Sequence, residues 1–261
     1  MRVDPIAYIL GVKKILLSYF GYYLGSPYLK IQSLSNKPGV GYTSKIIPKR
    51  LNFRKTTDLC FIMHAEGSDK GLSSHNYTTF YSSVFPKNRR LKIKRVFELG
   101  IGSNNPETPS NMGKGGVPGG SLRGWRKFFP KATIFGADID RGTLFKEERI
   151  RTFYCDQQDS ESIDYLWTKN PELKGNFDLI IEDGFHSFRA NISFFENSVR
   201  KLKVGGVYVI EDIDEYLVRL WRQTIQSFYL EKYPNLAFCI VEIPLDKNPY
   251  NNKLIVIERI R

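Results

Sequence analysis

The sequence predicts an α/β fold: a doubly wound, seven-stranded sheet that is mostly parallel, has an antiparallel last strand and follows an N-terminal extension. Three observations indicate it. From about residue 92, short apolar runs alternate with amphipathic stretches, the pattern of a parallel sheet with crossover helices. The last two apolar runs are joined by an extended loop instead of a helix, which is typical of an antiparallel pair. A chain of 261 residues can bury one sizeable core and carry an appendage.

The expected strands are the apolar runs, and the expected helices are the amphipathic stretches between them. Strands are predicted at residues 95–99, 133–137, 151–155, 177–182, 206–210, 238–241 and 254–257. Helices are predicted at residues 122–129, 160–169, 187–202 and 216–233. Seven strands that close with a hairpin are the Rossmann-like arrangement of class I methyltransferases, whereas a plain Rossmann dehydrogenase would keep a helix before its last strand.

The first part of the chain differs from the rest, so we predict an N-terminal helical and irregular arm at 1–57 and the sheet-bearing domain at 58–261. Segment 6–25 is the one candidate for a membrane element. Lys13 and Lys14 divide it into apolar runs too short to span about 30 Å of hydrocarbon. A docking or dimerisation helix, and with it a homo-oligomer, is therefore favoured over peripheral membrane contact.

The chain is basic, with 39 Lys and Arg against 27 Asp and Glu and a net charge of +12. Such a balance attracts anionic partners. The densest basic runs, 45–55 and 87–95, lack the interleaved aromatics of a single-strand nucleic-acid platform, so no nucleic-acid partner is expected. The basic residues are compatible with two interpretations, a solvated face and a surface that attracts anions. Cys60, Cys155 and Cys239 lack metal-ligand spacing, which favours reduced core cysteines in a cytoplasmic protein.

A cofactor signal follows the first predicted strand of the domain, in the sequence Glu98-Leu-Gly100-Ile-Gly102. Glycines at such a turn let the backbone approach a ligand closely. The third glycine of a dinucleotide fingerprint is missing, and a long loop, 103–120, precedes the next helix, for which we expect Ser121 as the N-cap. Such a loop leaves no tight helix N-terminus for a pyrophosphate.

Polar residues also end the next two predicted strands. Asp138 stands where a carboxylate can bind both ribose hydroxyls, and Asp156 and Gln157 stand where polar groups can meet an adenine amine. Acidic strand ends suit a nucleoside without phosphates, such as S-adenosylmethionine. The alternative is that these aspartates only form turns or cap helices.

Two further strands end in Glu-Asp, which places Asp183 and Asp212 at neighbouring strand tips if the strands are adjacent. Two close carboxylates repel unless a cation lies between them. Mg²⁺, or another divalent cation such as Mn²⁺, would bind both and would lower the pKa of a substrate hydroxyl. His186 follows on the same loop and can accept the hydroxyl proton. The alternatives are metal-free capping aspartates and a turn histidine.

Several segments, taken in order, resemble the macrocin and mycinamicin type of sugar O-methyltransferases and their relatives in bacterial capsule and surface-polysaccharide clusters. The resemblance covers about residues 58–217. The segments are GSDKG with His75-Asn-Tyr77, FELGIG, GGSLRGWRKFFP, GADID, CDQQD, IIEDGFH and GGVYVIED.

The resemblance implies an S-adenosylmethionine- and Mg²⁺-dependent enzyme in which Asp183 and Asp212 bind the metal and His186 is the base. It also places a set of residues near the cofactor: Lys70, His75, Tyr77, Ser121, Leu122 and Arg123. The family's strand often reads Asp-Asp-Gly-Ser-His, from which Glu182 and Phe185 depart. We expect Glu182 to point to the opposite face and to matter little. Glu107 and Glu211 are candidates for a third metal ligand.

For the acceptor, the basic composition favours a nucleotide-linked heptose or deoxysugar of capsule or surface-polysaccharide synthesis. A macrolide-type sugar, a nucleic acid, and a non-catalytic binding protein that keeps the fold are the alternatives. Nucleic-acid base methyltransferases often carry an Asn/Asp-Pro-Pro-Tyr/Phe strand end, and this chain has Glu182-Asp-Gly-Phe-His186 there.

Overall fold

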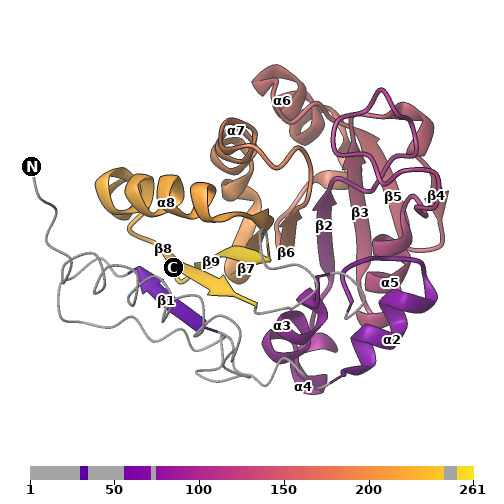
Figure 1. Ribbon diagram of the computed structural model, residues 1–261, viewed down its shortest axis with the longest axis horizontal. Coiled ribbons are helices and arrows are strands. Elements are labelled where there is room, and N and C mark those ends of the chain that lie inside the picture. The colour runs from indigo at the N-terminus through magenta and orange to yellow at the C-terminus, as the bar shows by residue number, and fades with distance from the viewer. Residues whose placement is uncertain (1–29, 35–55, 72–74, 244–251) are drawn as a thin grey trace, which may run out of the picture.

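The computed structural model describes residues 30–34, 56–71, 75–243 and 252–261, and these residues form one nine-stranded sheet (Figure 1). All seven predicted strands are present, each within a few residues of its expected bounds. They are β2 (Arg95–Leu99), β3 (Thr133–Asp138), β5 (Ile150–Tyr154), β6 (Phe177–Glu182), β7 (Leu202–Ile213), β8 (Leu236–Glu242) and β9 (Lys253–Arg259).

The strands lie in the order β1-β8-β9-β7-β6-β2-β3-β5-β4. Strands β5, β3, β2, β6 and β7 pair in parallel, and β9 runs antiparallel to both of its neighbours, β7 and β8. The predicted mostly parallel arrangement with an antiparallel last strand is therefore confirmed for the seven expected strands. Two short strands were not predicted: β1 (Lys30–Leu34) pairs with β8, and β4 (Lys146–Glu147) pairs with β5.

Helices cover both faces of the sheet (Figure 1). One apolar core lies under α2 (Asp58–Ala65), α3 (Tyr77–Val84) and α5 (Gly120–Phe128). The other lies under α6 (Ser160–Lys169), α7 (Phe188–Ser198) and α8 (Glu215–Thr224). Short turns complete the set: α4 (Lys87–Arg90), α9 (Leu230–Lys232), η1 (Arg141–Thr143), η2 (Pro171–Leu173), η3 (Val199–Lys201) and the π-helix η4 (Ile225–Tyr229).

The start of α5 corrects one prediction. The N-cap is Gly119, with a φ of 72°, and not Ser121, which lies in the first turn of the helix. The left-handed conformation suits glycine, and a Cβ there would collide with the ring of Phe145. The chain therefore enters α5 two residues earlier than a side-chain cap would require.

Membrane contact was expected, if anywhere, at segment 6–25, which lies outside the described residues. Among the helices of the described ranges, none is long and apolar enough to cross a membrane.

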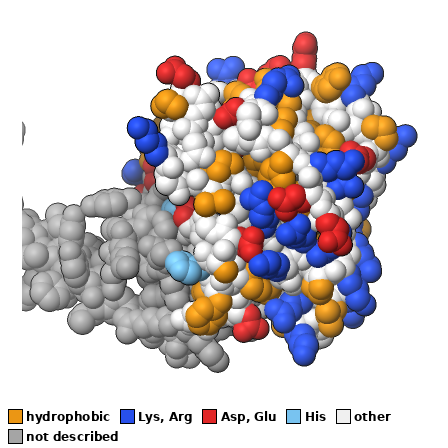
Figure 2. Space-filling model, turned by 90° about the vertical axis from the view of Figure 1, so that its right-hand side faces the viewer, with side chains coloured by type: hydrophobic (Ala, Val, Ile, Leu, Met, Phe, Trp, Pro, Cys, Tyr) orange, Lys and Arg blue, Asp and Glu red, His pale blue; other side chains and the backbone are white. Residues whose placement is uncertain are grey.

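The basic side chains do not form one patch on the face drawn in Figure 2, where they alternate with acidic and apolar groups. Arg123 and Arg126, for example, both pair with Glu147 of β4.

All three cysteines are free and buried, as the sequence predicted. Burial raises the pKa of Cys155 to about 12, so its thiolate is scarce at pH 8. We expect iodoacetamide to leave Cys155 unmodified in the native protein and to label it after unfolding in guanidinium, as read by peptide mass spectrometry. Equal labelling of native and unfolded protein would contradict the buried position.

Candidate functional site

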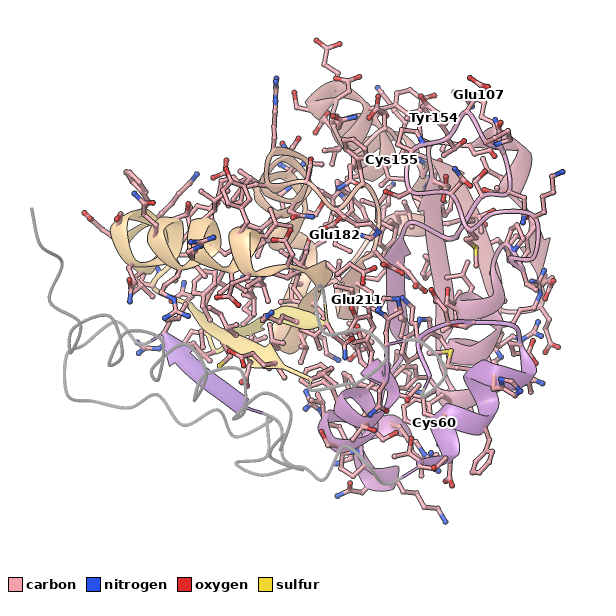
Figure 3. All side chains as sticks on the ribbon, in the orientation of Figure 1. Cys60, Glu107, Tyr154, Cys155, Glu182 and Glu211 are labelled. Atoms are coloured by element: carbon pink, nitrogen blue, oxygen red, sulfur yellow. The ribbon has the colours of Figure 1, made fainter. Side chains whose placement is uncertain are left out.

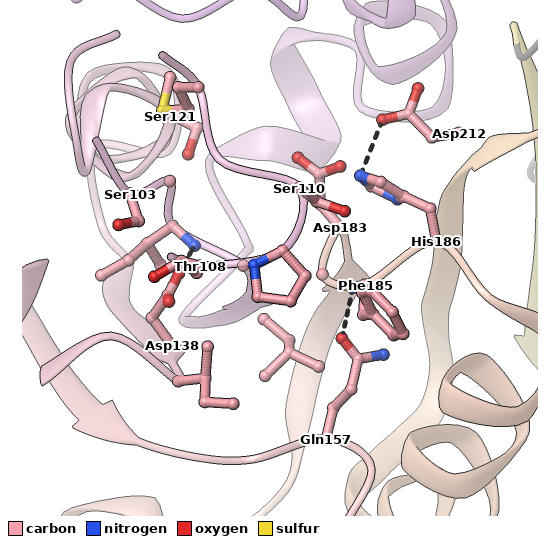
Figure 4. A pocket seen from close by; sticks show the side chains of 18 of the residues that line it. Ser103, Thr108, Ser110, Ser121, Asp138, Gln157, Asp183, Phe185, His186 and Asp212 are labelled. Atoms are coloured by element: carbon pink, nitrogen blue, oxygen red, sulfur yellow. Dashed lines mark hydrogen bonds and ion pairs between the residues drawn. The ribbon is translucent and has the colours of Figure 1, made fainter. Parts of the chain in front are cut away.

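A pocket opens at the carboxyl ends of β2, β3, β5, β6 and β7, the edge at which open α/β sheets bind ligands. Figure 4 shows it from close by. Ten of the predicted site residues line it: Lys70, Gly100, Gly102, Ser121, Asp138, Asp156, Gln157, Asp183, His186 and Asp212. Residues far apart in the sequence thus meet in one cavity.

The glycine turn after β2 brings two backbones into contact. Gly100 has a φ of 80° and Gly102 a φ of 87°. A Cβ on Gly100 would lie 1.9 Å from the carbonyl oxygen of Asp183, because the tips of β2 and β6 touch here. Only glycine combines this conformation with this approach.

Replacing Gly100 by alanine is therefore expected to destabilise the fold by about 2 kcal/mol or more, because the added methyl group is both strained and overpacked. Gly113→Ala is the matched control: Gly113 has a φ of 69°, but a Cβ there would have no atom within 4 Å. Urea unfolding of both variants measures the difference. A similar loss in both would show that the contact with Asp183 does not matter.

The acidic strand ends lie on one side of the pocket. Asp138 is buried, and its carboxylate accepts hydrogen bonds from the backbone N–H of Ile101 and of Asp140, both at 2.9 Å. Burial raises the pKa of Asp138, although these two bonds oppose the rise. Asp156 accepts from the backbone N–H of Gln158 at 2.9 Å. Both aspartates line the pocket, and a carboxylate has more acceptor sites than these bonds use.

Gln157 and Glu182 form a pair that the sequence did not predict. The Gln157 side chain donates from Nε2 to Glu182 at 2.8 Å and accepts at Oε1 from the backbone N–H of Phe185 at 2.7 Å. Glu182 does point to the face opposite Asp183, but it is fully buried and engaged there. The predicted direction of Glu182 is therefore confirmed, and its hydrogen bonds link it to Gln157 and Asn191.

On the other side of the pocket, Asp183, His186 and Asp212 each offer one possible ligand atom, and these atoms lie within 4.8 Å of one another. Strands β6 and β7 are parallel neighbours, as predicted, and this pairing brings the two aspartates together. The three side chains converge in Figure 4. Two carboxylate oxygens and an imidazole nitrogen fit a divalent cation.

Two of these three residues have strained backbones. His186 has a φ of 38° and Asp212 a φ of 54°, in the left-handed region that β-carbons disfavour. Nε2 of His186 lies 3.5 Å from Asp212, and its buried Nδ1 has no hydrogen-bond partner in the described residues. Such conformations are enriched at functional sites, so they add to the case for a candidate site at these residues.

Lys70 is the buried counter-ion of the site. Its ammonium group lies 2.6 Å from Asp183 and 3.1 Å from Glu98, and it also contacts Glu211, while only 2 % of its side chain is exposed. Burial alone would lower the pKa of Lys70, but Asp183, Glu211 and Glu98 raise it well above its usual value. For Asp183, burial is outweighed by the Lys70 ammonium group, which holds the pKa of this carboxyl below its usual range.

Two residues of the segment 70–77 lie against Asp212 and not in the pocket lining. The Tyr77 hydroxyl donates to Asp212 at 2.7 Å, and Nδ1 of His75 lies 3.2 Å from the same oxygen atom. The two rings stack with their centroids 5.0 Å apart. Burial and the carboxylate of Asp183 raise the pKa of Asp212, so a cation at this position would relieve an existing repulsion.

Five other candidates lie outside the pocket lining. Glu98 accepts from the Trp125 indole, Leu122 is a core residue, and Arg123 pairs with Glu147. Glu211 is fully buried between Lys70 and Tyr81, which donates to it at 2.5 Å, so its oxygen atoms are already occupied. Glu107 is exposed and far from Glu211 (Figure 3). Neither glutamate is part of the ligand group that the described residues form.

The sequence did not place the loop 103–120 over the pocket. Thr108, Pro109, Ser110 and Met112 of this loop line it, and so does Asp69. The loop is anchored by its own bonds, including those from the Met112 N–H to Ser103 and from the Gly119 N–H to Ile101. The sequence shows that this segment is a long, glycine-rich loop. Its position over the pocket depends on tertiary contacts that have no local sequence signal.

Comparison with curated proteins gives relatives that are named as O-methyltransferases. The chain is 36% identical over 140 residues to mycinamicin VI 2''-O-methyltransferase of Micromonospora griseorubida, covering 53% of this chain and 32% of the relative. It is 34% identical over 142 residues to demethylmacrocin O-methyltransferase of Streptomyces fradiae, covering 54% and 32%. The chain thus matches about a third of the length of these relatives. No family model matches the sequence.

Comparison with solved structures gives the fold. MycE methyltransferase from the mycinamycin biosynthetic pathway, in complex with Mg and SAH, superposes with a TM-score of 0.60 at 27% identity, over 79% of this chain and 56% of MycE. This chain has the class I methyltransferase fold. The same MycE with mycinamycin VI also bound gives a TM-score of 0.59 at 28% identity, over 79% and 56%.

Proposed function

We propose that this chain is an S-adenosylmethionine-dependent, divalent-metal-dependent O-methyltransferase that acts on a sugar hydroxyl. The observation that carries the proposal is the ligand group of Asp183, His186 and Asp212 beside a pocket with acidic strand ends. The fold supports it, and so do relatives named as O-methyltransferases, one of which has a rhamnosyl compound in its name.

The residues divide the chemistry between the two sides of the pocket. S-adenosylmethionine would supply an electrophilic methyl group, and Asp138 and Asp156 would accept hydrogen bonds from its nucleoside hydroxyl and amine groups. A cation held by Asp183 and Asp212 would lower the pKa of the acceptor hydroxyl. His186, which lies on the loop after β6 beside both aspartates, would then accept the hydroxyl proton.

The pocket favours a neutral glycoside over the nucleotide-linked heptose that the composition suggested. Among the described residues that line it, Lys70 is the single Lys or Arg, and its ammonium group is already bound by three carboxylates. The same lining holds Asp69, Asp138, Asp156 and other acidic groups, which repel a diphosphate. The relatives' names point the same way, since one is a rhamnosyl tetracenomycin-C 2'-O-methyltransferase, 31% identical over 147 residues.

Labelled S-adenosylmethionine tests the proposal. The purified chain is incubated with a macrolide or aromatic rhamnoside, with a nucleotide-diphosphate sugar and with RNA, each with and without EDTA. We expect methyl transfer to the rhamnoside, its loss with EDTA and its return with Mg²⁺. Transfer to RNA, or to the nucleotide sugar alone, would overturn the acceptor, and transfer that is indifferent to EDTA would overturn the metal.

A further inference from the structure

The loop 183–187 carries His186, and a buried pair of side chains holds it from the nucleoside side of the pocket. The backbone N–H of Phe185 donates to Oε1 of Gln157 at 2.7 Å, and that of Gly184 donates to Oε1 of Glu182 at 3.3 Å. Gln157 and Glu182 are joined by their own hydrogen bond at 2.8 Å. The two residues directly before His186 are therefore both bonded to one pair.

The pair is itself rigidly held. Glu182 is 1 % exposed, and its other carboxylate oxygen accepts from Asn191 of α7 at 2.5 Å. A Cβ on Gly184 would lie 1.8 Å from Oε1 of Gln157, so the loop packs against the amide as closely as a glycine allows. Phe185 and Gln157 are the joined pair at the lower edge of the pocket in Figure 4.

Both polar ends of Gln157 are thus engaged inside the protein. Nε2 faces Glu182, and Oε1 faces the backbone of Phe185, so groups of the protein itself orient the amide. A side chain held in this way can fix the position of the loop 183–187, to which it is bonded through Phe185. This differs from the direct adenine contact that the sequence suggested for Gln157.

We propose that Gln157 and Glu182 are positioning residues, which fix the loop 183–187 so that the strained His186 faces the acceptor hydroxyl. The inference rests on the proposed function for the role of His186. The hydrogen-bonded bridge from β5 through β6 to the loop would set the rate of methyl transfer and leave cofactor affinity nearly unchanged.

An exchange of the two side chains tests the bridge. In Gln157→Glu, two carboxylates face each other, and in Glu182→Gln the new amide meets the Asn191 and Gln157 donors. In the double variant Q157E/E182Q, Gln at 182 can donate to Glu at 157 and accept from Asn191, and Glu at 157 still accepts from Phe185. The Gly184 N–H, which Oε1 of Glu182 accepts in the parent chain, then meets the amide nitrogen and loses its acceptor. The bridge returns with its polarity reversed.

Amide hydrogen exchange of Gly184 and Phe185 in the ligand-free protein gives a readout that needs no methyl transfer. We expect exchange to rise roughly tenfold in each single variant, which corresponds to the loss of one hydrogen bond to a charged group. In the double variant the Phe185 amide should return toward its original rate, while the Gly184 amide, which has lost its acceptor, should stay fast. Gln158→Glu, which adds the same charge at the exposed neighbouring position, is the control and should leave these amides unchanged. Unchanged exchange in both single variants would overturn the bridge.

Kinetics then test the positioning role. We expect kcat to fall roughly tenfold in the single variants and to recover in the double variant, while the dissociation constant of S-adenosylhomocysteine changes less than about threefold. Glu182→Asp, which keeps the charge but shortens the reach, should behave like the single variants. Equal loss of cofactor affinity and kcat, with no recovery in the double variant, would make Gln157 a cofactor ligand instead. If the parent chain methylates no sugar, the proposed function is wrong. The hydrogen-exchange rates still test whether Gln157 and Glu182 hold the loop, because they need no methyl transfer.

Discussion

Replacing Lys70 by methionine is expected to lower the free energy of unfolding by about 3–5 kcal/mol, because the change leaves buried carboxylates without their cation. Glu98 and Glu211 are fully buried, and Asp183 is partly so. Methionine has nearly the volume of the lysine stem, so the loss reports charge and not packing. Urea unfolding at pH 7.5 in the presence of EDTA measures it.

A second lysine supplies the control for this result. Lys253 is almost as buried, but its partner Glu215 is 65 % exposed, so Lys253→Met should cost about 1 kcal/mol or less. Adding Glu211→Gln to Lys70→Met should recover part of the loss, because it removes one uncompensated carboxylate. Equal losses at Lys70 and Lys253, or no recovery in the double variant, would contradict the charge cluster.

The loss at Lys70 should also depend on pH. Burial already raises the pKa of Glu98 and Glu211, with Lys70 opposing, and removal of the ammonium group raises both further. A carboxyl group whose pKa is higher in the folded than in the unfolded state binds its proton more tightly when folded. Stability is therefore lost as pH rises above about 4.3, the unfolded value for Glu. We expect the deficit of Lys70→Met to be smaller at pH 5 than at pH 8.

Replacing His186 by alanine is expected to lower kcat by about 10²–10⁴, the usual contribution of a general base, while the affinity for S-adenosylhomocysteine stays within a few-fold. The assay is the labelled-methyl transfer to the best acceptor found. His64, which is exposed on the last turn of α2, provides the control, and His64→Ala should keep full activity.

The structure also groups His186 with the two aspartates, so its role as a base needs separation from a role as a ligand. Titration of Mn²⁺ into His186→Ala and into Asp183→Asn separates them. We expect Mn²⁺ to bind His186→Ala nearly as well as the parent chain and Asp183→Asn much more weakly. A large loss of Mn²⁺ affinity in His186→Ala would show that the imidazole holds the cation.

The sequence predicted the sheet well because buried parallel strands form continuous apolar runs, which need no tertiary information to recognise. It missed β4, since two residues carry no period, and it missed α2 and α3 as helices. The N-cap at Gly119 was also missed, because the choice between a glycine and a serine cap depends on the ring of Phe145.

The site was predicted in part for a similar reason. Acidic residues at strand ends can be located from strand bounds alone, and this placed Asp138, Asp183 and Asp212 correctly in the pocket. The partners of a buried charge cannot be located in that way. The role of Lys70 depends on Glu98 of β2 and Glu211 of β7, and in the sequence each of these residues is a separate candidate for binding a ligand.

The contact between Gly100 and Asp183 has a consequence for attempts to redesign the protein. Because the nucleoside turn and the cation-binding tip share one backbone interface, neither can be reshaped without displacing the other. New acceptor preferences should therefore be sought by grafting or randomising the loop 103–120, whose residues Thr108 to Ser110 border the cavity from outside that interface. Variants in this loop leave the contact between Gly100 and Asp183, and the residues on both sides of it, in place.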